Sequence, residues 1–102
     1  MLDKRKFYIN GTWTNPSKPN DFKVINPSNE EPFATISLGF KEDIDDAVKS
    51  AKKAFETWKE TSKEERISLL EKLLIIYKKR FNEMFGAIST DMGAPMDWSS
   101  QV

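Results

Sequence analysis

The chain of 102 residues offers chemistry only through carboxylates, lysines, tyrosines and hydroxyls, because it contains no cysteine and no histidine. A thiolate nucleophile, a Ser–His–Asp triad and a His/Cys metal site each need one of these missing residue types. The four glycines, Gly11, Gly39, Gly86 and Gly93, fit neither a dinucleotide G-x-G-x-x-G nor a phosphate-binding P-loop. We therefore expect no catalytic residue and no nucleotide cofactor in this chain alone.

One acidic cluster has enough carboxylates to suggest a metal site. Glu42, Asp43, Asp45 and Asp46 follow one another closely, but they lack the D-x-D-x-D-G pattern of a calcium loop. The alternative interpretation is that they open a helix, where the helix dipole stabilises negative charge. We favour the helix start.

Charge and hydropathy exclude several classes of partner. Lys plus Arg and Asp plus Glu are equal at 16 each, whereas a nucleic-acid-binding protein normally has a basic excess. A helix that binds anionic membrane surfaces is also rich in Lys and Arg. No apolar run reaches the roughly 20 residues that span a bilayer, and the charged start of the chain leads into no apolar signal core. We expect a cytoplasmic protein that binds neither nucleic acid nor membranes.

Residues 1–39 are predicted to form a β-rich N-terminal part. Asn10-Gly11 lies between pairs of residues with high β propensity and predicts a hairpin over residues 7–14. Further short strands are predicted at residues 22–25 and 33–38, separated by a turn that begins at Asn26-Pro27.

Residues 40–102 are predicted to be helical. A first amphipathic helix should run from about residue 41 to 60, with apolar residues three, four and seven positions apart. Ser62 and Glu65 form a capping box that starts a second helix. That helix would reach about residue 92 and be on the order of 45 Å long. Gly93 should end it, and Pro95 suits the first residue of a third helix.

The predicted fold class is therefore α+β. Short N-terminal strands with an antiparallel hairpin precede two long amphipathic helices and the start of a third, in one partial domain over residues 1–102. The second helix is apolar around most of its circumference at residues 73–77. Two amphipathic helices and a thin sheet cannot cover all the apolar faces that they carry, and an exposed apolar patch usually marks an interface or an aggregation liability. We expect a homo-oligomer, most simply a symmetric dimer.

Five segments, in order along the chain, resemble the aldehyde dehydrogenase superfamily. The second resembles the motif V-x-N-P-[AS]-[TS]-G-E, and the third resembles D-V-D-x-A-V-x-x-A-x-x-A-F-x-x-W. The chain departs from the family at Glu30, where a turn glycine is usual, and at Ala94, where lysine is usual. The five segments are Tyr8–Trp13, Val24–Glu30, Asp43–Trp58, Ser62–Leu70 and Thr90–Pro95.

The resemblance implies a parent oxidoreductase that uses NAD or NADP to oxidise an aldehyde to a carboxylic acid through a cysteine thiohemiacetal. The family's nucleophilic cysteine, general-base glutamate, oxyanion-hole asparagine and most nucleotide contacts lie downstream of this region. The chain then corresponds to an N-terminal fragment of the cofactor-binding domain, inactive alone. The alternative is a self-associating helical interaction module derived from the family.

The resemblance also implies one candidate site. Several family members hold a structural monovalent cation through main-chain carbonyls before the Asn-Pro turn and an acid before the x-Gly-x-Pro stop. The corresponding residues are Val24, Ile25 and Asp91, and such oxygen ligands suit a hard cation. The family's site also needs a downstream ligand, so for this chain alone we favour Asp91 as a solvated residue at a helix end.

Overall fold

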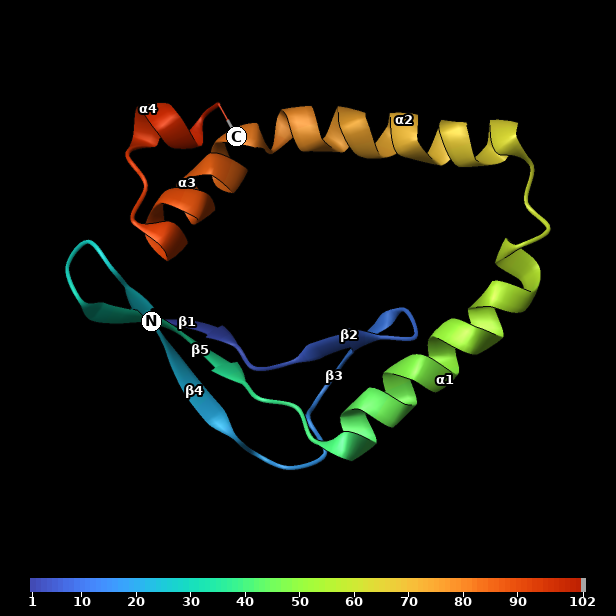
Figure 1. Ribbon diagram of the computed structural model, residues 1–102, viewed down its shortest axis with the longest axis horizontal. Coiled ribbons are helices and arrows are strands. Elements are labelled where there is room, and N and C mark those ends of the chain that lie inside the picture. The colour runs from blue at the N-terminus through green and yellow to red at the C-terminus, as the bar shows by residue number, and fades with distance from the viewer. Residues whose placement is uncertain (102) are drawn as a thin grey trace. The chain divides into compact units, whose positions relative to one another are not determined.

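The computed structural model describes residues 1–101, in which short strands precede a series of helices (Figure 1). This arrangement confirms the predicted α+β class. The strands are β1 (Leu2–Lys4), β2 (Phe7–Ile9), β3 (Thr12–Thr14), β4 (Asp21–Asn26) and β5 (Glu31–Ser37). The helices are α1 (Lys41–Trp58), α2 (Lys63–Lys79), α3 (Phe81–Met92) and α4 (Met96–Ser99).

The chain divides into two compact units. The first contains residues 1–25 and 32–60, and the second contains residues 26–31 together with the chain from Thr61 onward. Helix α1 therefore belongs with the strands, whereas the turn between β4 and β5 belongs with the other helices. No helix among residues 1–101 is long and apolar enough to cross a membrane.

A three-stranded sheet with the order β1-β5-β4 lies in the first unit. Strand β1 pairs in parallel with β5, so that Leu2 is opposite Ala34 and Lys4 is opposite Ile36. Ala34 is the only buried apolar residue among those described. No sequence pattern predicted β1, because a strand of three residues that include two charged ones shows no periodicity. The strand forms by pairing along one edge of β5.

The predicted hairpin is confirmed over β2 and β3. The antiparallel register places Ile9 opposite Thr12 and leaves Asn10 and Gly11 at the turn. Both turn residues have positive φ, 54° and 76°, which is the backbone of the primed turn that Asn-Gly favours. The hairpin contacts α1 through β2 (Figure 1).

The long second helix predicted over residues 62–92 is wrong, because the structure has two helices that meet at Arg80. Arg80 departs from helical geometry, with φ of −105° and ψ of 16°, and its guanidinium pairs with Glu83 in the first turn of α3 at 3.0 Å. Edge-to-face ring contacts link Tyr77 to Phe81 and Phe81 to Phe85, with centroids 6.1 and 5.4 Å apart. Only the Tyr77–Phe81 contact crosses the break, and rings four residues apart also meet in a continuous helix, so these contacts do not account for the break. No glycine or proline marks it either.

Gly93 ends α3 as predicted. Its φ of 71° is left-handed, and its N–H donates to Ser89 O at 2.8 Å, which is a common helix ending that glycine favours. A Cβ at this position would lie 2.9 Å from Cγ of Pro27 and 3.2 Å from Oγ of Ser28. The turn between β4 and β5 therefore packs directly against this helix end within the second unit.

The segment after Gly93 is held by hydroxyl groups. Ser89 Oγ donates to the carbonyl of Ala94 at 2.7 Å, and Ser99 Oγ donates to the same carbonyl at 3.5 Å. Ser99 is fully buried. The predicted third helix is α4, which begins one residue after Pro95.

Candidate functional site

The carboxylate cluster at residues 42–46 opens α1, as the dipole interpretation predicted. Asp43 is buried, with 8% of its surface exposed. Its carboxylate accepts hydrogen bonds from the Phe40 N–H at 2.9 Å, the Ser17 N–H at 2.8 Å and the Ser17 hydroxyl at 3.1 Å. The Phe40 and Ser17 hydrogen bonds lower the pKa of Asp43 below its ordinary value. Asp43 therefore fastens the loop before β4 to the first turn of α1.

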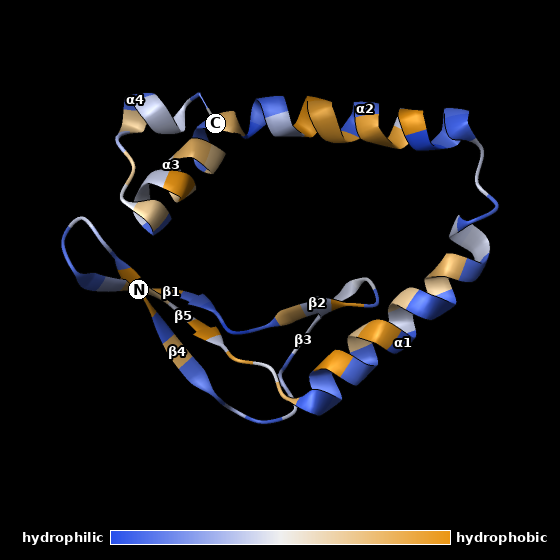
Figure 2. Ribbon diagram, viewed as in Figure 1, coloured by the Kyte–Doolittle hydropathy of each residue, from blue (hydrophilic) through white to orange (hydrophobic). Residues whose placement is uncertain are grey.

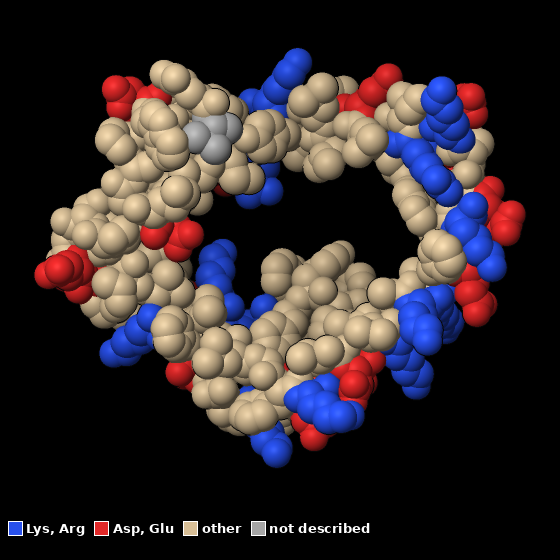
Figure 3. Space-filling view, viewed as in Figure 1, with Lys and Arg blue, Asp and Glu red and all other residues tan. Residues whose placement is uncertain are grey.

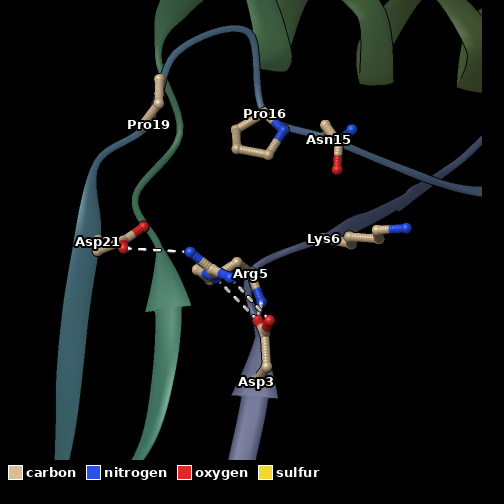
Figure 4. Close-up of a pocket in the computed structure, with 7 residues that line it drawn as sticks. All are labelled: Asp3, Arg5, Lys6, Asn15, Pro16, Pro19 and Asp21. Atoms are coloured by element: carbon tan, nitrogen blue, oxygen red, sulfur yellow. Dashed lines mark hydrogen bonds and ion pairs between the residues drawn. The ribbon is translucent and has the colours of Figure 1, made fainter.

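A second polar cluster surrounds Arg5 in the first unit (Figure 4). Arg5 Nε and Nη2 donate to the two carboxylate oxygens of Asp3 at 2.9 and 2.8 Å. Its Nη1 donates to Asp21 at 3.4 Å. The guanidinium thus joins the end of β1 to the start of β4. Sequence reasoning missed this cluster, because Asp21 is 16 residues from Arg5 and no local pattern connects them.

The Arg5 cluster lines an open pocket of about 270 Å³. Its charged groups hold the strands together and do not suit acid–base catalysis. The hydrogen bond from Arg5 lowers the pKa of Asp3 to about 2, and the same pairing raises the pKa of Arg5. General acids and bases work best with a pKa near the operating pH, and both shifts are in the opposite direction. Lys6 extends away from the guanidinium (Figure 4). The pocket is lined by Asp3, Arg5, Lys6, Asn15, Pro16, Pro19 and Asp21.

The candidate cation residues fall in different units. Val24 and Ile25 lie on β4 in the first unit, and Asp91 is exposed in the last turn of α3 in the second unit. Among residues 1–101, no group of three or more acidic side chains could hold a metal ion. The cation site stays a prediction that rests on the family resemblance.

Positive and negative side chains alternate on the face of the molecule that Figure 3 draws. Lys and Arg are interspersed with Asp and Glu along α1 and α2 (Figure 3). The isolated ion pairs are exposed, as in Lys41–Asp45 at 2.6 Å. No basic stripe of the kind that binds nucleic acids is seen on that face.

Exposed apolar surface is the most prominent feature of α2. None of the described residues of this helix is buried. Apolar residues lie along the whole helix among charged ones (Figure 2). Leu70 is 64% exposed and Leu73 is 60% exposed, although such residues are usually found in protein cores. The other large apolar residues exposed on α2 are Ile67, Leu69, Leu74, Ile75 and Ile76.

Comparison with a model of a known protein family covers most of the chain. The family model described as "Aldehyde dehydrogenase family" matches residues 13–101. The chain belongs to the aldehyde dehydrogenase family. The match confirms the resemblance seen in the five sequence segments, and it concerns the N-terminal segment of the family.

Curated relatives agree with this assignment. A 3-succinoylsemialdehyde-pyridine dehydrogenase of Pseudomonas sp is 42% identical over 96 residues, which are 94% of this chain and 20% of that protein. A putative aldehyde dehydrogenase of Staphylococcus aureus (strain bovine RF122 / ET3-1) is 37% identical over 102 residues, or 100% of this chain and 22% of that protein. The chain therefore spans about a fifth of the length of the curated relatives it matches.

Solved structures of the family contain the same backbone. The crystal structure of an aldehyde dehydrogenase from Bartonella henselae matches with a TM-score of 0.98 and 55% identity, over 100% of this chain and 21% of that one. Aldehyde dehydrogenase C from Pseudomonas syringae, crystallised with NAD⁺ and octanal, matches with a TM-score of 0.93 and 36% identity, over 96% of this chain and 20% of that one.

Proposed function

We propose that the chain serves as the N-terminal structural segment of an NAD(P)-dependent aldehyde dehydrogenase. Such an enzyme oxidises an aldehyde to a carboxylic acid and transfers a hydride to NAD or NADP. The observation that supports this function most strongly is the family match over residues 13–101. The proposed location is the cytoplasm, where a protein without disulfide bonds meets a reducing environment.

In this proposal, the chain contributes packing and not chemistry. Family relatives are about five times as long, and the chain itself has no cysteine to act as the nucleophile. The exposed faces of α1 and α2 are then the surfaces that the rest of such a subunit covers. Ile44 and Phe55 on α1 are 61% and 59% exposed. This exposure agrees with the proposal, because the described part of the chain leaves more than half of each residue uncovered.

The test is a turnover assay on the purified 102-residue chain. We expect no aldehyde-dependent formation of NADH or NADPH with short and long aliphatic aldehydes. A positive control is the Bartonella henselae aldehyde dehydrogenase, assayed under the same conditions. Cofactor reduction by the chain that depends on added aldehyde would contradict a purely structural role.

A self-associating interaction module is the second candidate function. It is favoured by α2, a helix of 17 residues without a buried residue among those described. Isolated helices of about this length are marginally stable in water, and tertiary packing supplies most of the stability of protein helices. A second copy of the chain could supply that packing.

A further inference from the structure

The tip of the β2–β3 hairpin carries a reactive dipeptide with no role in the proposed function. Asn10 and Gly11 occupy the two turn positions and are both exposed. A Cβ placed on Gly11 would meet no described atom within 4 Å. The backbone N–H of Gly11 donates no turn hydrogen bond to a described residue. Gly11 is thus exposed, and its N–H has no acceptor among the described residues.

An asparagine before such a nitrogen can cyclise. The deprotonated backbone nitrogen of Gly11 attacks Cγ of Asn10, the bond from Cγ to Nδ2 breaks, and ammonia leaves. Water then opens the succinimide ring at either carbonyl, which gives aspartate or isoaspartate. The reaction consumes one water and releases one ammonia, without any oxidant or metal. A bulky residue after asparagine would hinder the attack, whereas glycine has no side chain and moves freely.

Helix α1 adds a group that can assist this reaction. Ser50 Oγ donates to Oδ1 of Asn10 at 3.3 Å. Oδ1 gains negative charge while the nitrogen attacks Cγ, and a donor aimed at an oxygen that gains charge stabilises the transition state. Asn10, Gly11 and Ser50 line the same groove between the hairpin and α1. We propose that Asn10 is a self-modification site, which forms a succinimide with Gly11 and uses Ser50 as the oxyanion donor.

The modification changes the contact between the hairpin and α1. Isoaspartate adds one carbon to the backbone, and the register of Ile9 with Thr12 leaves room for a two-residue loop only. The primed turn depends on that loop length. The exchange of the amide for a carboxylate does not itself break the contact, because the Ser50 hydroxyl can donate to a carboxylate oxygen as well. The longer backbone of isoaspartate is the disruptive change. Modified chains should therefore hold the hairpin less firmly against α1.

The experiment follows Asn10 and Asn29 during incubation of the intact chain at mildly alkaline pH and 37 °C. Peptide mapping by mass spectrometry measures conversion of each asparagine, and an isoaspartate methyltransferase assay identifies the product. Asn29 is an internal comparison, since it is also exposed in a turn and its Oδ1 also accepts a hydrogen bond, from the Glu31 N–H at 3.0 Å, but the next residue is glutamate and not glycine. We expect conversion at Asn10 and not at Asn29. An unmodified Asn10, or equal conversion at both positions, would overturn the proposal.

The variant Ser50→Ala tests the role of the donor. Loss of one neutral hydrogen bond should slow conversion of Asn10 by about two- to tenfold in the folded chain. In concentrated urea, where α1 and the hairpin are separated, the variant and the parent chain should react equally. Unchanged or faster conversion in the folded variant would show that Ser50 does not assist the reaction, and circular dichroism of both chains checks that α1 remains helical.

Discussion

Glu30 has a left-handed backbone, with φ of 60°, in the turn between β4 and β5. The turn requires this geometry, because the Glu30 N–H donates to Asn26 O at 2.8 Å while the side chain of Asn26 accepts from the Ser28 N–H at 2.9 Å. A Cβ in the left-handed region costs roughly 1–2 kcal/mol. The position is the one where the family resemblance led us to expect glycine.

Replacing Glu30 by glycine should stabilise the chain. Relief of the left-handed strain exceeds the extra entropy that glycine gives to the unfolded chain, so we expect a gain of about 0.5–1 kcal/mol in the free energy of unfolding. Urea unfolding followed by circular dichroism measures it. The matched control is Glu31→Gly in the extended strand β5, which should lose a similar amount. A stability of Glu30→Gly equal to or below that of the parent chain would show that the turn tolerates Glu30 without strain.

Gly93 illustrates the opposite case in the same unit. Its φ is 71°, and a Cβ would lie 2.9 Å from Cγ of Pro27, so backbone geometry and space both require glycine. Glu30 and Gly93 both have a left-handed φ, but only at Gly93 is there also no room for a Cβ. The Cβ there would clash with the rigid ring of Pro27. A left-handed φ at Glu30 strains only the residue itself.

At the scale of elements, the start of α1 depends on one buried carboxylate. Phe40 precedes the helix and has no side-chain acceptor, so the usual serine or aspartate cap is missing. Asp43 replaces part of that function by accepting from the Phe40 N–H at 2.9 Å. It also accepts two hydrogen bonds from Ser17, 26 residues earlier. One side chain therefore holds a helix end and a loop together.

The variant Asp43→Asn should lower the melting temperature at neutral pH by about 5 °C, the effect of losing a helix cap in a small domain. The pKa of Asp43 is lower in the folded chain than its ordinary value of 3.8. Its stabilisation is therefore present above pH 3.8 and is lost as the pH falls through the folded pKa. The parent chain should lose stability below about pH 4, and Asp43→Asn should lose less over the same range. Thermal melts at several pH values measure both effects.

Asp45→Asn is the matched control for that series. Asp45 lies on the same helix and pairs with Lys41 in an exposed ion pair, and exposed pairs contribute little. A melting temperature of Asp45→Asn as low as that of Asp43→Asn would mean that general charge on α1, and not the buried hydrogen bonds, supports the helix start.

At the scale of the whole molecule, the apolar side chains outnumber the places where the chain can bury them. Ala34 is buried, but Trp58, Leu70 and Leu74 are 45%, 64% and 51% exposed. Apolar surface removed from water contributes roughly 25 cal/mol per Å², so uncovered faces of this kind favour association. In a longer aldehyde dehydrogenase the rest of the polypeptide could supply the cover, and for the chain alone a second copy is the simplest partner.

Light scattering after size-exclusion chromatography should therefore find the 102-residue chain as a dimer. Leu74→Glu should shift it toward monomer, because a charge placed in an apolar interface is costly to bury. Lys72→Glu provides the matched control, since it introduces the same residue at a charged position of α2 and should leave the dimer intact. A sharply folded monomer of the parent chain at high concentration would rule out self-association, and equal effects of both variants would place the interface elsewhere.

The sequence by itself determined the features that depend on neighbours along the chain. Asn10-Gly11 specified the hairpin because its backbone preference matches a primed turn. Ser62 accepts from the Glu65 N–H at 3.1 Å, so the start of α2 was also readable from local residues. The family was recognisable from five short segments, because each couples a turn or helix signal to a fixed spacing.

Only the tertiary structure decided the features that join distant residues. Strand β1 exists because Leu2 pairs opposite Ala34, and Asp43 is buried because Ser17 folds back onto it. The end of α2 at Arg80 carries no glycine or proline, so no local signal in the sequence marks it. Local propensity acts between neighbours, whereas these contacts depend on the path of the whole chain. The apolar pattern of α2 likewise showed that other residues must pack against this helix. It did not show which surface packs there, because that surface is not encoded in the pattern of the helix itself.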